Sequence, residues 1–219
     1  MEISLGQTNN LKQLDTASFF DKNTLQRVVK VTNNALYRDI KRWLRNGQLI
    51  QLKRGLYVTG NYYQNVPDKQ TYLEFIANQL KYPSYLSLEY VLQKYSVLSE
   101  SVYTITSVSR KKTKSFKNQL GLFTYAKIKD DLFTGFKVVN KSGFEIKEAS
   151  KAKALFDWLY FRTRRVPQVN EAWLSSLRLN LEELTEEDFV ELKIYIGMEG
   201  GKKLKKVYKL VKKTLDYDF

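Results

Sequence analysis

The chain has 219 residues, of which 43% are hydrophobic, enough for one large domain or two small ones. It contains no cysteine and no histidine, which excludes disulfide bonds, thiolate nucleophiles, Ser-His triads and the usual zinc ligands. The net charge of +14 favours a polyanionic partner such as nucleic acid. With no apolar run of about 18 residues and no secretory or transit signal, we expect a cytoplasmic protein that has no membrane partner.

The first sixty residues are predicted to form short helices followed by a two-stranded hairpin. Residues 9–14 and 22–31 have short helical patterns, and residues 31–47 have a longer one that begins at Thr32 or Asn33 and stops at Gly47. The runs QLIQL (48–52) and GLYVTG (55–60) are typical of strands joined around the turn KRG (53–55). Two helices and a basic hairpin indicate a winged helix-turn-helix.

The helix expected over residues 33–46 has two chemically different sides. Leu36, Ile40, Trp43 and Leu44 form a stripe that should face the core. The opposite side carries the residues that we predict to enter the major groove, namely Asn34, Arg38, Lys41 and Arg45. Tyr37 and Arg42 flank that side, and the hairpin turn carries Lys53 and Arg54; we expect these four to contact the DNA backbone or to act as the wing.

The basic charge is concentrated in this part of the chain. Residues 22–54 contain nine Lys or Arg and a single acid, Asp39, whereas residues 181–219 contain eight basic and nine acidic residues. A solvated helix face usually mixes charges of both signs, and most charge runs are such faces. The near absence of acids here favours DNA contact over that alternative.

The remaining chain is predicted to be a connector and a mixed α/β domain. Residues 61–70 resemble a loop, residues 71–80 a helix, and Pro83 should follow its end. From residue 82 onward, we expect a helix at SLEYVLQKY (87–95) and strands at VYTITSVS, LFTYAKI, FKVVN and FEIKEA, all rich in aromatic and β-branched residues. SKAKALFDWLYFR (150–162) has an amphipathic helical pattern, and the chain after Pro167 is mostly helical.

Two lysine-rich segments leave their roles open. The segment SRKKTKSFK (109–117), between two predicted strands, is either a solvated loop or a contact for DNA, RNA or protein. The helix expected at KKLKKVYKLVKKTL (202–215) has Leu204, Val207, Tyr208, Val211 and Leu215 on one stripe. We expect this stripe to pack against the protein, although membrane-surface helices have the same pattern and a supplementary DNA contact is a further alternative.

The residues leave one enzymatic alternative. Asp131, Glu145 and Lys147 have the spacing of a D…ExK nuclease, in which two acids hold magnesium and the lysine activates water. The same spacing arises easily in a chain with 27% charged residues. We therefore predict no catalytic residue, no metal and no cofactor. The acidic segment EELTEEDFVELK (182–193) is interpreted as a helix capped by Thr185 and Asp188.

An ordered series of segments resembles the AbiEi antitoxin family between about residues 20 and 165. These segments are GLYV, YPSYLSLEYVLQKY, VYTITSVSRKKTKSF, LFTYAKIKDDLFTGF and EASKAKALFDWLYFR. The family's S-P-E-K-A-L-x-D signature is matched here by Lys153, Ala154, Leu155 and Asp157, with Lys151 and Ala152 in place of Pro-Glu. No similarity is evident beyond residue 165.

The resemblance implies a transcriptional regulator of a type IV toxin–antitoxin system, which provides abortive infection as a phage defence. It implies an N-terminal winged helix and a C-terminal α/β antitoxin domain. It also implies that the protein represses its own operon through repeats in the upstream double-stranded DNA, and that it neutralises a nucleotidyltransferase-like toxin without requiring a stable complex. A stand-alone regulator, or a winged helix that binds protein in place of DNA, would have the same sequence pattern.

The predicted fold class is accordingly α+β, a winged helix-turn-helix followed by a mixed α/β domain of antitoxin type. The expected division is residues 1–60 for DNA binding, residues 61–81 for a helical connector and residues 82–219 for the C-terminal domain with its helical end.

Overall fold

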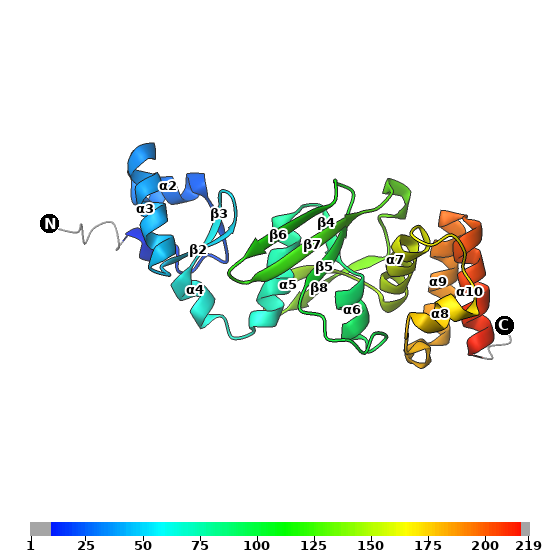
Figure 1. Cartoon of the computed structure of the whole chain (residues 1–219). Coiled ribbons are helices and arrows are strands. Elements are labelled where there is room, and N and C mark those ends of the chain that lie inside the picture. The colour runs from blue at the N-terminus through cyan, green and yellow to red at the C-terminus, as the bar shows by residue number, and fades with distance from the viewer. Residues whose placement is uncertain (1–9, 216–219) are drawn as a thin grey trace.

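The structure is a computed structural model that describes residues 10–215. The chain is mixed α+β, with a small N-terminal unit at one end, a six-stranded mixed sheet in the middle and three helices at the other end (Figure 1). The part of the predicted first helix that lies before residue 10 falls outside the described residues. Between residues 10 and 215, no helix combines the length and the apolar character needed to cross a bilayer.

Between residues 20 and 59, the N-terminal unit contains two helices and three short strands. Its elements are β1 (Phe20–Asp21), α2 (Lys22–Val29), α3 (Asn33–Arg45), β2 (Leu49–Lys53) and β3 (Leu56–Thr59). The side chains of Asp21 and Thr32 cap α2 and α3 by accepting hydrogen bonds from backbone N–H groups in the first turn, and Thr32 is one of the two helix starts predicted for α3. The strands form an antiparallel sheet in the order β1-β3-β2. The sequence does not predict β1, because two residues show no periodicity.

A separate hydrophobic core holds this unit together. Leu25 and Val29 of α2 pack with Leu36, Ile40 and Trp43 of α3, and all five side chains are buried. Burial of such side chains contributes about 1.5–3 kcal/mol each. The predicted core stripe of α3 is thus confirmed, with Leu44 half-buried at its edge.

The predicted connector is helical and is partly integrated into the larger core. It contains α4 (Gly60–Asn65) and α5 (Lys69–Leu80), so the loop expected over residues 61–70 is limited to residues 66–68. Thr59 caps α4 and Asp68 caps α5, which are signals that the tyrosine-rich run between them obscures. The buried residues Tyr72, Ile76 and Leu80 place α5 in the main core.

The central sheet has the order β6-β7-β5-β4-β9-β8. Its strands are β4 (Ser84–Leu86), β5 (Ile105–Ser109), β6 (Lys114–Asn118), β7 (Gly121–Lys127), β8 (Phe136–Lys141) and β9 (Phe144–Ala149). The β4–β9 and β5–β7 pairs are parallel, and the others are antiparallel. Strands β5, β7, β8 and β9 match the predicted strands, whereas β4 is short and β6 is lysine-rich, so neither was expected.

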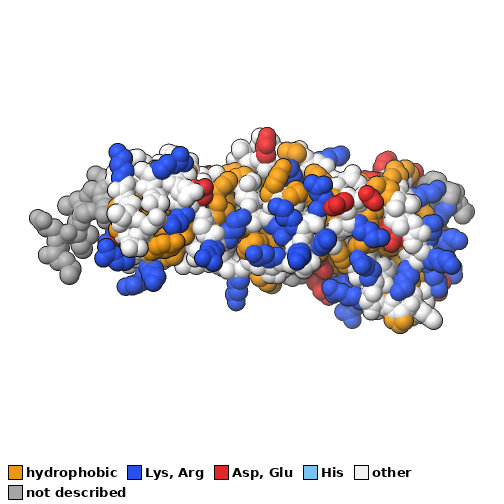
Figure 2. All heavy atoms as spheres, turned by 90° about the horizontal axis from the view of Figure 1, so that it is seen from above, with side chains coloured by type: hydrophobic (Ala, Val, Ile, Leu, Met, Phe, Trp, Pro, Cys, Tyr) orange, Lys and Arg blue, Asp and Glu red, His pale blue; other side chains and the backbone are white. Residues whose placement is uncertain are grey.

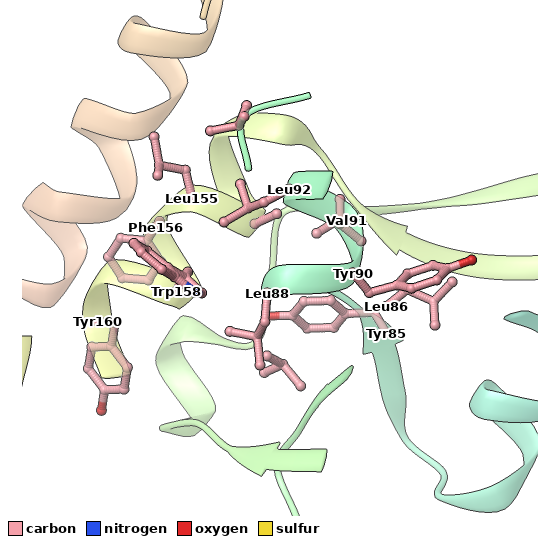
Figure 3. Packing of buried hydrophobic residues seen from close by; sticks show 14 of the residues in the cluster. Tyr85, Leu86, Leu88, Tyr90, Val91, Leu92, Leu155, Phe156, Trp158 and Tyr160 are labelled. Atoms are coloured by element: carbon pink, nitrogen blue, oxygen red, sulfur yellow. The ribbon is translucent and has the colours of Figure 1, made fainter. Parts of the chain in front are cut away.

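Helices α6 (Glu89–Lys94) and α7 (Lys151–Thr163) pack beside β4. Figure 3 shows Leu92 of α6 beside Leu155 of α7, whereas Tyr90 of α6 and Leu86 of β4 lie on the side away from α7. The helix predicted over residues 150–162 is confirmed, but its expected amphipathic character is wrong, because both sides of this helix are buried. Helices α9 (Glu186–Glu199) and α10 (Lys202–Thr214) pack against α7 and cover the side that would otherwise face water.

The C-terminal helices are α8 (Glu171–Ser176), α9 (Glu186–Glu199) and α10 (Lys202–Thr214), with the short 3-10 helices η1 (Asp130–Leu132) and η2 (Leu181–Glu183) in connections. The capping box of Thr185 and Asp188 is present at the start of α9, as predicted. Leu204, Val207 and Val211 of α10 are buried against the protein. This confirms the expectation that the apolar stripe of α10 packs internally.

Candidate nucleic-acid interface

The polar side of α3 is exposed along its whole length. Asn34, Arg38, Lys41 and Arg45, the four predicted major-groove residues, are all exposed. Their side chains form no hydrogen bond or ion pair with any other residue in the range 10–215. Because Leu36, Ile40 and Trp43 fix the opposite side of the helix in the core, this polar side points away from the protein. Its donors are free to bind an external partner.

The single acid of α3 does not weaken this positive face. Asp39 is 7% exposed, and its carboxylate pairs with Arg42 at 2.8 Å. The Arg42 guanidinium also lies 5.9 Å from the centre of the Trp43 ring. Arg42 is therefore held at the flank of the helix, where the sequence places it, and α3 presents cations without an unpaired carboxylate.

Lys22 and Tyr37 connect the start of α2 to the exposed side of α3. The Lys22 ammonium donates to the Tyr37 hydroxyl at 2.9 Å and lies 4.1 Å from the centre of its ring. That hydrogen bond lowers the pKa of Tyr37 below its ordinary value, because it stabilises the phenolate. Tyr37 remains 55% exposed. Lys22 was not among the predicted site residues, since its position against α3 depends on tertiary packing.

The hairpin turn carries Arg54 but not Lys53. Arg54 is exposed beside Gly55, whose φ of +78° suits a glycine at a tight turn. Lys53 turns inward and donates to the backbone carbonyls of Leu80 at 2.8 Å and Gln79 at 3.3 Å. These carbonyls end α5, so the ammonium satisfies acceptors that the helix leaves open. This differs from the DNA contact that the sequence predicts for Lys53.

A basic cleft separates the hairpin from β6. It is lined by Leu44, by Gln51–Arg54 of the hairpin and by residues 114–119 of β6 and its turn. The Asn118 amide donates to the Leu52 carbonyl at 2.8 Å, which fixes β6 beside the hairpin. Burial lowers the pKa of Lys53, and the positive charges of Lys114, Lys111 and Lys81 lower it further. Cations from three separate segments therefore repel one another along this cleft.

The lysine-rich segment 109–117 is divided between the end of β5, a connection over residues 110–113 and the edge strand β6. Lys114 and Lys117 are exposed on β6, whereas Arg110, Lys111 and Lys112 are exposed in the connection. Figure 2 shows Lys and Arg side chains on the end that carries the N-terminal unit and along the neighbouring surface. The positive surface is accordingly wider than the helix and hairpin alone.

The residues of the nuclease alternative lie on separate elements. Asp131 belongs to η1, whereas Glu145 and Lys147 belong to β9. The Lys147 ammonium lies 4.8 Å from the centre of the Tyr82 ring. Among residues 10–215, no three acidic side chains are placed to hold a metal ion together.

The two charged residues that match the antitoxin signature are enclosed in the core. Lys153 and Asp157 pair at 2.8 Å, and both side chains are 0% exposed. The Asp157 carboxylate also accepts hydrogen bonds from Tyr85 at 2.9 Å and Ser87 at 2.8 Å, while Lys153 donates to the Leu132 carbonyl. These hydrogen bonds join α7 to the β4 segment and to η1. Because water is excluded from them, breaking any one would leave a buried polar group without a partner.

Comparison with known proteins identifies no relative of this chain. The geometry of the exposed side of α3 and the neighbouring basic surface is therefore the basis for a functional proposal. No protein-family model matches the chain, and no curated protein is significantly similar to it. The resemblance to AbiEi antitoxins remains an expectation from the sequence.

Proposed function

We propose that the protein is a DNA-binding antitoxin of a type IV toxin–antitoxin system and that it represses its own operon. The observation that carries this proposal is the exposed side of α3, where Asn34, Arg38, Lys41 and Arg45 have no partner within the described residues. Guanidinium and amide groups on such a helix recognise guanine and adenine edges in the major groove, and lysine neutralises phosphate.

The N-terminal unit acts as a winged helix-turn-helix in this proposal. Helix α2 supports α3, and the β2–β3 hairpin is the wing, with Arg54 at its tip. The pairing of β1 with β3 fixes the hairpin beside the helices. Lys22 and Tyr37 lie at the start of α2 and on α3, where a phosphate beside the groove would meet them.

The antitoxin half of the proposal is supported by the resemblance in the C-terminal domain. The partner is a nucleotidyltransferase-like toxin, neutralised without a stable complex. A stand-alone winged-helix regulator is the alternative, and it would use the same α3 and hairpin.

Co-expression of the full chain with a nucleotidyltransferase-like protein encoded beside it distinguishes the antitoxin from the stand-alone regulator. We expect Arg38→Ala to lose repression and to keep growth rescue, because Arg38 lies on the DNA-facing side. If the wild-type chain did not restore growth, the antitoxin role would be rejected and the stand-alone regulator would remain.

The DNA-binding claim is tested by fluorescence anisotropy on the duplex upstream of the gene and on a scrambled duplex. We expect Arg38→Ala to lose about 1–3 kcal/mol of binding free energy on the upstream duplex and much less on the scrambled one. Lys137→Ala is the matched control, because Lys137 is an exposed cation on β8, at the sheet edge opposite β6. Equal losses for the two variants would show that only net charge matters and would reject α3 as the reading element.

A further inference from the structure

Helix α9 carries an apolar stripe on the side that faces water. Val190 is 63% exposed, Ile194 is 57% exposed and Met198 is 49% exposed. The spacing of four residues places these side chains one above the other on a helix. The opposite side of α9 is already occupied, because Phe189, Leu192 and Ile196 are buried. The exposed stripe is therefore additional to the face that holds α9 in the fold.

The space above this stripe allows another helix to approach. Gly197 lies next to Met198, and a Cβ atom added to it would have no atom within 4 Å. Small residues at such positions let helix backbones come close. A contiguous apolar strip rimmed by charged residues is typical of a protein interaction site.

The exposed charges that flank α9 differ in sign at its two ends, while α9 itself carries the exposed Lys193 near its middle and the half-buried Glu199 in its last turn. Its N-terminal end and the preceding turn carry the exposed acids Glu182, Glu183, Glu186 and Glu187. Its C-terminal end leads directly into the exposed lysines Lys202, Lys205 and Lys206 of α10. Figure 2 shows acidic and hydrophobic side chains beside a group of lysines at this end of the molecule. The acidic start of α9 is therefore complementary to the basic start of α10 in a second copy whose α9 lies antiparallel to the first.

We propose that the protein self-associates through α9, with the α9 helices of two copies packed antiparallel about Ile194. This register sets Val190 against Met198 of the second copy. Glu186 lies eight residues before Ile194 in the first turn of α9, about 12 Å along that helix. Lys202 is the first residue of α10 and follows the C-terminal end of α9 after Gly200 and Gly201, so Glu186 of one copy approaches Lys202 of the other. A parallel arrangement would place acids against acids, which is unfavourable.

Self-association at α9 leaves the DNA-facing surface free. Helices α9 and α10 lie at one end of the molecule, and α3 lies at the other (Figure 1). Two copies joined at α9 therefore present their α3 helices at the far ends of the assembly. The inference does not depend on DNA binding, because the mass of the protein is measured without DNA.

The mass of the full chain in sedimentation velocity tests the inference. We expect a concentration-dependent rise toward twice 25.7 kDa at protein concentrations on the order of 10–200 µM, since one helix pair gives a weak interface. Ile194→Glu should stay monomeric. Val138→Glu is the matched control, because Val138 on β8 has the same 57% exposure, and it should associate as the wild type does. A wild-type chain that is monomeric at about 200 µM, or an Ile194→Glu variant that still associates, would overturn the inference.

A charge exchange tests the antiparallel register. Glu186→Lys alone and Lys202→Glu alone should each weaken association several-fold, because each places like charges together. The double variant Glu186→Lys, Lys202→Glu should recover most of the loss and should have the wild-type circular dichroism spectrum. Single variants that match the wild type, or a double variant weaker than both, would reject this pairing.

Discussion

Replacement of Lys53 by methionine separates a structural role from DNA contact. The change keeps the aliphatic stem and removes the ammonium that donates to the carbonyls of Leu80 and Gln79 at the end of α5. A hydrogen bond from a charged group contributes about 1.5–3 kcal/mol. Relief of burial and of repulsion from the neighbouring lysines offsets part of that loss, since both lower the pKa of Lys53. We therefore expect a net loss of about 1–2 kcal/mol in the free energy of unfolding.

Thermal unfolding and DNA binding measured together provide the assay. For a chain of this length, a loss of about 1–2 kcal/mol lowers Tm by roughly 2–8 °C. Arg54→Ala is the matched comparison on the same hairpin, because Arg54 is exposed and should change stability by less than about 0.5 kcal/mol while weakening binding to all sequences. If Lys53→Met left Tm unchanged and weakened DNA binding as much as Arg54→Ala, the assignment of Lys53 to the α5 terminus would be refuted.

Three further substitutions test other parts of the structure. Asp39→Asn should release Arg42 and raise the affinity for the upstream and scrambled duplexes alike, by about threefold, as anisotropy would show. An unchanged affinity would mean that the charge of Asp39 does not oppose DNA binding. Lys153→Met should lower the free energy of unfolding, measured by chemical denaturation, by about 3–5 kcal/mol, because Asp157 would be buried without its cation. The double variant Lys153→Met, Asp157→Leu should lose less than the sum of the losses of the two single variants. Burial raises the pKa of Asp157 in the folded state, so the stability deficit of Lys153→Met should be smaller near pH 4 than near pH 8, and a deficit independent of pH would show that Asp157 is not charged there. Gly60→Ala should lower stability by about 1–3 kcal/mol, since the added Cβ would lie 2.0 Å from a backbone carbonyl oxygen, and a wild-type Tm would show that this contact relaxes freely.

The elements of the N-terminal unit are predictable because their signals are local. Capping residues, a four-residue apolar spacing and Gly55 at the turn all lie within a few positions of the structure that they specify. The exposed side of α3 follows from the same periodicity. Arg38, Lys41 and Arg45 are accordingly placed where the sequence predicts, pointing away from the core.

The remaining features depend on contacts between distant segments. Lys53 and Arg54 are adjacent in the sequence, yet only the position of α5 determines that Lys53 turns inward. Lys22 meets Tyr37 across the two helices. Strand β6 resembles a solvated loop because its lysines face water at the edge of the sheet, where pairing with β7 alone defines it. No periodicity along the chain carries this information.

The salt dependence of binding to the upstream duplex tests the central claim most directly. With about five phosphates neutralised by α3, the hairpin and their neighbours, the slope of log K against log salt should be near −4.5, so affinity should fall about 500-fold between roughly 50 and 200 mM salt. The upstream duplex should bind more tightly than the scrambled duplex at every salt concentration. Binding that is absent at low salt, or equal on both duplexes, would contradict the account and leave the basic side of α3 as a solvated surface.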